Sequence, residues 1–434
     1  MLRRLLSETM NNAQAWEKLF SKYEILRHVD LNGQFRISAD QIKEFREPRL
    51  MTKFDHKINL PGLFTKNNLA ILPVTRGDYL IAHFDAYHKI EDCKSQVMRL
   101  SLPDNIQSLD CNNIFSEAVA LNCAFVSGII TDFLNEDIIV PTVAGRMSTG
   151  AFAFAITDTS TNTNRPVSVS NAQMEIDAAY EGRSCMAVIE AKRELSEDFI
   201  IRQIYYPFRV WQNRITKTVR PIFFVYSNNI FSLYEYAFDD PRNYSSIKLV
   251  QHKNYSVEDT SITAQDIYDL LQNIQITDEP YGIPFPQANT FERVINLCKL
   301  LNERSMSKLE ITEQYAFDER QAYYYVNSAR YLGLAEKTSH DGKTVYTLTN
   351  KGHKIICMSY KKRQLSLCRL ILSHKVFREV MNLYFSRGHL PDIKEVENIM
   401  QSSQLYNIGS GSTFHRRAQT IRKWAEWISE LIAE

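Results

Sequence analysis

Residues 173–211 have the sequence QMEIDAAYEGRSCMAVIEAKRELSEDFIIRQIYYPFRVW. Polar and apolar residues alternate over 173–180, the turn EGRS follows, and a short apolar run occupies 185–189. Alternation and a short apolar run are typical of strands, so the stretch predicts two neighbouring strands. The helical spacing after them predicts an amphipathic helix over 198–209.

Two acids and a lysine lie on these strands. Side chains of a strand alternate between its faces, so Glu190 and Lys192 lie on one side, and Asp177 faces them if the strands pair. Two carboxylates are oxygen ligands of the kind that Mg²⁺ takes. Such a cluster suits metal-assisted hydrolysis of a phosphodiester, in which Lys192 would orient the attacking water and stabilise the phosphorane.

A structural reading stands beside this one, because acids at strand ends and a nearby lysine are common in α/β proteins. The following helix carries Gln203 and Tyr206. Packing against a sheet explains Tyr206 equally well, whereas the amide of Gln203 needs a polar partner.

The spacing resembles the active-site signature of the PD-(D/E)xK nucleases. Asp177 is followed thirteen residues later by Glu190, within the tripeptide Glu-Ala-Lys, and Ile176 stands where the family pattern often has proline. The flanking residues resemble type II restriction endonucleases, in which a GR-x-S-x-G-x-F segment, here 145–152, leads into a QxEID strand and then an EAK strand.

The resemblance implies a mixed sheet flanked by helices, as in restriction endonucleases, and Mg²⁺-dependent cleavage of double-stranded DNA at a short specific sequence. It also implies a homodimer, because two strands must be cut, and a cognate DNA methyltransferase acting on the same site. The implied catalytic residues are Asp177, Glu190, Lys192, Gln203 and Glu117. The implied Mg²⁺ ligands are Asp177, Glu190 and the backbone of Ala191.

Glu117 belongs to this set because it lies near the start of a helix expected over 113–133. Nucleases of this class often keep an extra metal ligand on the helix before the core sheet. The alternative is that an acid in a first helical turn complements the helix dipole.

Composition limits the class of protein. A chain of 434 residues, 44% hydrophobic and 23% charged, has room for two to four globular domains. Its apolar runs are too short for a membrane span and no signal segment follows Met1, so a cytoplasmic protein is expected. Seven cysteines without CxxC spacing indicate reduced thiols and argue against a zinc site.

The chain divides into an N-terminal α+β module, a nuclease domain, a winged-helix domain and a basic helical region. The expected bounds are 1–95, 96–285, 286–360 and 361–434. In the first module, helices are expected over 11–26 and 37–45 and strands over 68–73 and 78–86.

Basic residues in two loops are candidates for contacts with the DNA backbone. Arg46, Arg49 and Lys53 surround Pro48, and a salt-bridged surface loop explains them as well. Arg146 and Ser148 lie in a glycine-flanked segment whose N–H groups could approach a phosphate, although turn chemistry is an equal explanation.

The C-terminal half predicts two readers of DNA. Helices over 291–301, 307–314 and 319–332 followed by a hairpin over 336–348 indicate a winged helix. The third helix of that fold enters the major groove. The residues expected to contact DNA there are Arg320, Gln321, Tyr324, Asn327 and Ser328, with Lys337 or Lys343 on the wing. A protein-docking module is the alternative.

The second reader is the basic end of the chain. The formal net charge is only +1, yet residues 351–434 carry 14 Lys and Arg against 7 Asp and Glu. A helix over 413–431 places Arg416, Arg417 and Lys423 largely on one side, where they could contact phosphates. A solvated amphipathic helix explains them too.

Two other functions remain open from the sequence. A DNA-binding regulator would use the helical modules and keep the acids as structural residues. A repair or structure-specific nuclease would use the same chemistry on branched, nicked or damaged DNA.

Overall fold

The computed structural model describes residues 11–91, 93, 95–111, 114–193, 196–257, 261–315, 319–340, 343–403, 405 and 412–432. The chain forms two compact units. The first comprises Met1–Gln96, Phe115–Tyr226 and Phe231–Asn254, and the second Val97–Ile114, Ser227–Ile230 and Tyr255–Glu434. Each unit is described separately below.

The first unit begins with helices packed on a small sheet. The elements are α2 (Asn12–Lys22), α3 (Ile25–Asn32), β1 (Gln34–Ser38), α4 (Ala39–Lys43), α5 (Pro48–Met51), η1 (Lys57–Asn59), α6 (Gly62–Lys66), β2 (Ala70–Pro73), β3 (Asp78–Ala82) and β4 (Tyr87–Lys89). The strands pair antiparallel in the order β1-β3-β2. Trp16, Phe20 and Phe64 form the aromatic centre of this core.

The helix boundaries here differ from two predictions. The helix expected over 11–26 ends at Lys22, because Glu24 adopts a left-handed conformation (φ 46°) before α3 begins. The helix expected over 37–45 starts only at Ala39, since the preceding residues belong to β1. Its predicted capping box is confirmed, with Ser38 and Gln41 each accepting a hydrogen bond from the other's backbone.

The main sheet is mixed, and its strands in the first unit run in the order β14-β13-β12-β10-β9-β6. The central pair, β9 (Gln173–Glu181) and β10 (Cys185–Lys192), is antiparallel, whereas β10 and β12 (Thr218–Ser227) are parallel. The remaining strands are β13 (Ile230–Phe238) and β14 (Ile247–Ser256), preceded by the short helix η2 (Tyr244–Ser246). The α/β class predicted from the sequence is confirmed, with a mixed sheet flanked by helices.

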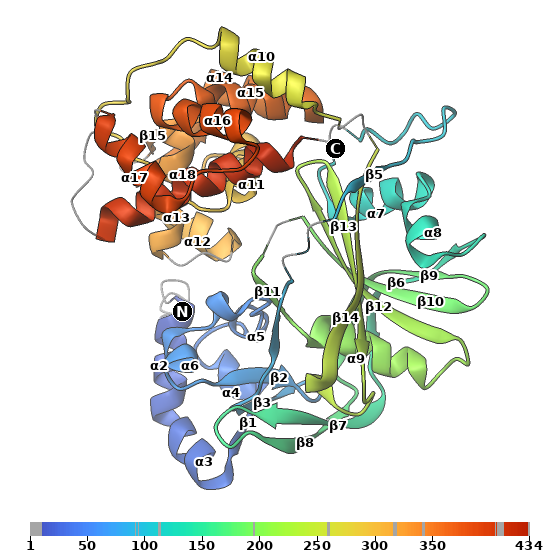
Figure 1. Ribbon diagram of the computed structural model, residues 1–434. Helices are drawn as coiled ribbons and strands as arrows, with labels where there is room; N and C mark the ends of the chain where they lie inside the picture. The colour runs from blue at the N-terminus through green and yellow to red at the C-terminus, as the bar shows by residue number, and fades with distance from the viewer. Residues whose placement is uncertain are drawn as a thin grey trace. The chain divides into compact units, whose positions relative to one another are not determined.

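Two helices flank the central strands. Both α7 (Glu117–Val126) and α9 (Arg202–Gln212) contact β9 and β10, and Figure 1 shows α9 beside the labelled strands. The helix expected over 113–133 is interrupted at Gly128 (φ +79°), after which α8 (Ile129–Leu134) follows. The helix expected from residue 198 starts later, because residues 198–200 form β11, which pairs with β4.

Strand β6 (Val140–Ser148) corrects the loop expected over 145–150. Residues 145–148 pair with β9, and only the turn into β7 (Ala151–Asp158) is a loop. The next strands also pair, since β7 and β8 (Thr163–Ser170) form an antiparallel hairpin. Strands β6 and β8 are rich in polar residues, so the alternation of polar and apolar residues that predicts a strand is weak in their sequence. Pairing with neighbouring strands determines that they are strands.

The second unit contains the expected helices and hairpin. These are α11 (Phe291–Glu303), α12 (Lys308–Tyr315), α13 (Glu319–Tyr331), β15 (Ala335–His340) and β16 (Lys343–Leu348). The hairpin is antiparallel, and Met306 forms a further bridge to Tyr346. The prediction of these elements in this order is confirmed.

The rest of the second unit is largely helical. It contains β5 (Val97–Arg99), α10 (Ala264–Asn273), α14 (Asn350–Ile356), α15 (Tyr360–Leu372), α16 (Lys375–Arg387), α17 (Ile393–Ser402) and α18 (Ser412–Glu430). Trp424 is fully buried in the core and donates a hydrogen bond to the carbonyl of Ala288 (2.7 Å). Within the described residues, no helix has both the length and the apolar character that crossing a membrane requires.

Candidate active site

Asp177 and Glu190 lie on the two central strands of the first unit. The antiparallel register pairs Ala178 with Ile189, so the next step along each strand brings Asp177 beside Glu190. Asp177 Oδ2 accepts a hydrogen bond from the backbone N–H of Ala191 (2.8 Å). The predicted meeting of the two acids is therefore confirmed, and this hydrogen bond fixes the position of the Asp177 carboxylate.

Glu190 is the centre of the cluster. Lys192 Nζ and Gln203 Nε2 both donate to Glu190 Oε1, each at 2.6 Å. The strand alternation that predicted a shared face for Glu190 and Lys192 is thus confirmed, and α9 supplies the amide above them. Glu190 is 8% exposed, so these hydrogen bonds form away from bulk water.

Burial dominates the electrostatics of the acids. It raises the pKa of Glu190 to about 7, and the nearby charge of Asp177 adds to the effect. Burial also raises the pKa of Asp177, against the hydrogen bond from Ala191. For Lys192, burial acts in the opposite direction, but the charges of Glu190 and Asp55 outweigh it and raise the pKa of the ammonium group. Lys192 therefore keeps its positive charge among carboxylates.

Glu117 reaches the same cluster from the start of α7. Burial raises its pKa, and the charge of Asp177 raises it further while that of Lys192 lowers it. Glu117 also occupies the first turn of a helix capped by Ser116. Both readings from the sequence, an acid of the site and an acid favoured by the helix dipole, are compatible with this position.

Asp55 was missed in the sequence. It lies after α5, and its Oδ2 is 3.9 Å from Lys192 Nζ and 3.8 Å from Lys53 Nζ. Burial opposes its ionisation, but Lys192, Lys53 and the neighbouring cations outweigh burial, so its pKa is lowered. The segment REPRLMTKFDH has no periodicity that ties it to a sheet in another part of the chain, so the sequence does not link Asp55 to Lys192.

The donor set fits a hard divalent cation. Asp177 and Glu190 supply carboxylate oxygens, and Ala191 between the site residues supplies a backbone carbonyl. Gln203 Oε1 is buried without a hydrogen-bond partner, an orphaned acceptor beside Glu190 that a water or hydrated ion would satisfy. Within the described residues, no three His, Cys, Asp or Glu side chains form a group that could hold a metal ion, so any cation here would rest on two carboxylates and the carbonyl.

Tyr206 has a structural position. Its side chain is fully buried, its hydroxyl donates to the carbonyl of Pro73 (3.0 Å), and its ring packs against Phe152 and Phe154. The packing explanation of Tyr206 holds.

Arg146 and Ser148 lie on β6 and not on a phosphate-binding loop. Arg146 is exposed and pairs with Glu175 on β9 (3.4 Å), and Ser148 donates to Asn171 (3.2 Å). The interpretation of the segment as a loop with free N–H groups is wrong, because its backbone is in the β6–β9 ladder. Both side chains nevertheless remain on the surface.

The residues expected to read DNA on α13 divide into two groups. Arg320 is exposed and donates to the hydroxyl of Tyr324 (2.5 Å), with Gln321 half-buried beside them. Asn327 is 4% exposed and Ser328 is fully buried, so their proposed base contacts are corrected: these side chains belong to the core of the unit. The side chain of Lys343 lies outside the described residues.

The basic residues of α18 divide in the same way. Arg416 and Lys423 are exposed, and Lys423 pairs with Glu426 (2.8 Å). Arg417 is 4% exposed and donates to the carbonyl of Pro286 (3.3 Å). The expectation that Arg417 contacts DNA is wrong in this fold, because its guanidinium is turned into the unit.

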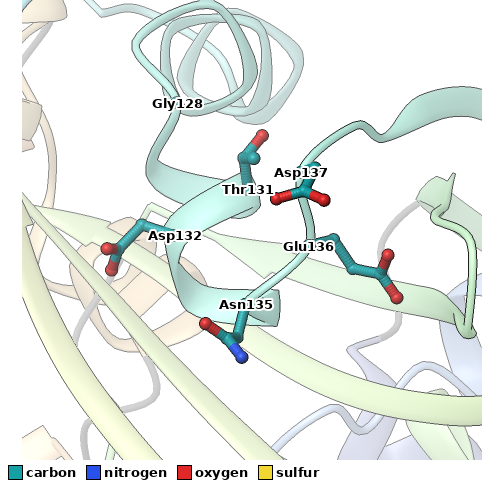
Figure 2. A pocket seen from close by; sticks show the side chains of 6 residues that line it. All are labelled: Gly128, Thr131, Asp132, Asn135, Glu136 and Asp137. Carbon is teal, nitrogen blue, oxygen red and sulfur yellow. The ribbon is translucent and has the colours of Figure 1, made fainter.

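A hollow of about 450 Å³ lies elsewhere in the first unit, around α8. Figure 2 shows its lining, and the carboxylates of Asp132 and Glu136 point away from each other. Glu136 accepts hydrogen bonds from the backbone of Arg183 (2.9 Å) and Ser184 (3.0 Å), and Lys253 lies 3.1 Å from Asp132. Asp132 and Glu136 are thus committed to partners outside the Asp177 cluster.

Comparisons with known proteins divide the chain into three matched segments. Each is described as a domain of unknown function: DUF6996 matches residues 13–81, DUF6997 matches 82–256 and DUF7226 matches 293–433. No curated protein and no solved structure matches the chain. Asp177, Glu190 and Lys192 fall in the second segment, whereas Asp55 falls in the first.

Proposed function

We propose that the chain is a Mg²⁺-dependent type II restriction endonuclease that hydrolyses double-stranded DNA at a short specific sequence. One observation carries the proposal: Asp177 and Lys192 lie beside the buried carboxylate of Glu190. The three residues have the spacing of the PD-(D/E)xK signature. A mixed sheet with helices on the strands that hold the acids is compatible with a restriction-endonuclease-like core.

Each residue has a part in the proposed reaction. Asp177, Glu190 and the carbonyl of Ala191 would hold Mg²⁺, which supplies positive charge against the developing phosphorane and acidifies water. Lys192 carries an ammonium group beside Glu190, where it stabilises negative charge and orients the water. Gln203 holds the Glu190 carboxylate in place from α9.

The second unit would supply sequence recognition. Its helices and hairpin resemble a winged helix, whose third helix docks in the major groove. The exposed Arg320 and the adjacent Tyr324 lie near the N-terminal end of α13, the end that contacts base edges in helix-turn-helix proteins. Arg416 and Lys423 would then contact phosphates from α18, which positions the protein without reading sequence.

The test is cleavage of a long duplex by the purified chain with Mg²⁺, followed by sequencing of the fragment ends. Discrete ends at one short motif are expected, and Lys192→Met should reduce cleavage by at least about a hundredfold because a charge at the reacting group is lost. Lys66→Met, on the exposed face of α6, is the matched control and should cleave as the wild type does. Absence of cleavage by the wild type across a range of sequences and divalent ions contradicts the proposal.

Two other outcomes identify the alternatives. A DNA-binding regulator would bind a specific sequence with wild-type affinity after Asp177 and Lys192 are changed to alanine, and the unmodified protein would not cut. A repair or structure-specific nuclease would cut branched or nicked DNA faster than a plain duplex, and its fragment ends would share no motif.

A further inference from the structure

We infer that Asp55, from the N-terminal part of the chain, is a positioning residue that holds the Lys192 ammonium group in the active site. The inference rests on the proposed nuclease function. It makes the site composite, because Asp55 lies in the first matched segment and Lys192 in the second.

The backbone around Asp55 is fixed against β11 of the first unit. The carbonyl of Asp55 accepts a hydrogen bond from the N–H of Ile200 (2.9 Å), and the N–H of Lys57 donates to Asp198 Oδ1 (3.1 Å). His56 Nδ1 lies 2.5 Å from the carbonyl of Asp198. These contacts join the segment to β11, which ends two residues before α9 begins, so the carbonyl of Asp55 and the two residues after it are held by hydrogen bonds.

The Asp55 side chain is directed toward the buried lysine. Its Oδ2 lies 3.9 Å from Lys192 Nζ, and the two side chains are 16% and 18% exposed. An ion pair with this little solvent is screened weakly. Lys53 Nζ approaches the same oxygen but its side chain is 68% exposed, so Lys192 is the partner that burial makes strong.

Lys192 needs this second carboxylate because Glu190 also binds Gln203 and, in the proposed reaction, a divalent cation. Glu190 Oε1 already accepts from Gln203 as well as from Lys192. A divalent cation on the Glu190 carboxylate would withdraw its charge from Lys192 and repel the ammonium group. Asp55 Oδ2, 3.9 Å from Lys192 Nζ, offers a second carboxylate that would keep the ammonium group in place.

A double-mutant cycle on the purified full chain tests the contact without any assay of cleavage. Thermal unfolding is measured for wild type, Asp55→Asn, Lys192→Met and the double variant, in EDTA. The fall in Tm for the double variant should be smaller than the sum of the single falls, because either change removes the same pair. Asp30→Asn, on the exposed face of α3, is the control and should combine additively with Lys192→Met. Additive effects at Asp55 would overturn the inference.

Single-turnover cleavage with Mg²⁺ tests the consequence for the reaction. Asp55→Asn should slow cleavage at saturating DNA by about tenfold to a hundredfold and leave the Kd for DNA unchanged, as expected when a supporting group is lost. Asp55→Glu, which keeps the charge, should recover most of the rate. An Asp55→Asn variant that cleaves at the wild-type rate, or an Asp55→Glu variant as slow as Asp55→Asn, would contradict the positioning role.

The two experiments separate the inference from the proposed function. If the wild type does not cleave DNA, the nuclease proposal fails, yet the cycle still reports whether Asp55 and Lys192 are coupled. If the wild type cleaves and the cycle is additive, only the role of Asp55 fails.

Discussion

Glu190 is a buried ionisable residue, and burial of its charge is unfavourable for folding. Its carboxylate is buried, its pKa is raised to about 7, and two donors converge on one of its oxygens. Buried charges are tolerated when they are paired and hydrogen-bonded. Lys192 and Gln203 meet that requirement, and the same contacts fix the direction of the carboxylate.

The Asp177 carboxylate is expected to contribute to cleavage but not to the stability of the fold. Asp177→Asn should reduce cleavage by about a hundredfold or more, because loss of groups supporting a metal already costs ~10–100-fold. Its Tm in EDTA at pH 7.5 should not fall. The pKa of Asp177 is raised by burial, so its charge weakens folding as pH rises above the ordinary range of about 3.9, and Asn removes that charge while its oxygen still accepts the Ala191 N–H.

The measurements are single-turnover cleavage and thermal unfolding of the same preparations. Asp30→Asn on α3 is the control for an exposed Asp-to-Asn change and should match the wild type in both. A large loss of Tm with Asp177→Asn would mean that the acid is a structural residue, which would favour the regulator hypothesis.

At the scale of elements, α13 shows how burial selects among residues of one helix. Arg320 is exposed near its start, whereas Asn327 and Ser328 are buried further along. Asn327 instead accepts a hydrogen bond from Arg330 (2.8 Å) within the same helix. The exposed surface of this helix is therefore its N-terminal half, to which Tyr323, 44% exposed, also belongs.

The start of α12 supports a prediction on pH. Glu310 accepts hydrogen bonds from the backbone N–H of Ser307 and from Arg304, each at 2.7 Å, and these interactions hold its pKa at about 2. A pKa below the unfolded value of about 4.3 means that Glu310 stabilises the unit above that pH, and that the stabilisation is lost as pH falls toward 2.

Glu310→Gln should therefore lower the denaturant midpoint of unfolding at pH 7. The difference in midpoint between the variant and the wild type should become steadily smaller as pH falls below 5. Urea unfolding of the full chain between pH 7 and pH 3 is the measurement. Glu336→Gln, exposed on β15, is the control. A difference that stays constant over this range would show that the ionised capping contact does not form.

At the scale of the whole molecule, charge is distributed unevenly along the chain. The net charge is +1, while residues 351–434 carry twice as many basic as acidic residues. Protein–DNA affinity depends on such local charge more than on the net value. A nearly neutral chain is thus compatible with the proposed function, because residues 1–350 carry the excess of acids that offsets this basic end.

A type II enzyme with one catalytic cluster per chain is expected to cut as a homodimer. Supercoiled plasmid with one site should be converted directly to the linear form when the dimer predominates, because two sites act in one encounter. Sedimentation of the DNA-bound protein and the time course of nicked and linear plasmid are the measurements. A monomer that accumulates nicked plasmid at every concentration would contradict the prediction.

The sequence by itself determined the α/β class, most helices and strands, and the face shared by Glu190 and Lys192. These follow from local periodicity, since alternation along one strand places residues without reference to the rest of the fold. Tertiary structure alone decided that Asp55 approaches Lys192, that residues 145–148 form a strand, and that Asn327 and Arg417 are buried. Each of these depends on which distant segment packs against the residue. The resulting hydrogen bonds and burial leave no periodic pattern in the sequence from which they could be predicted.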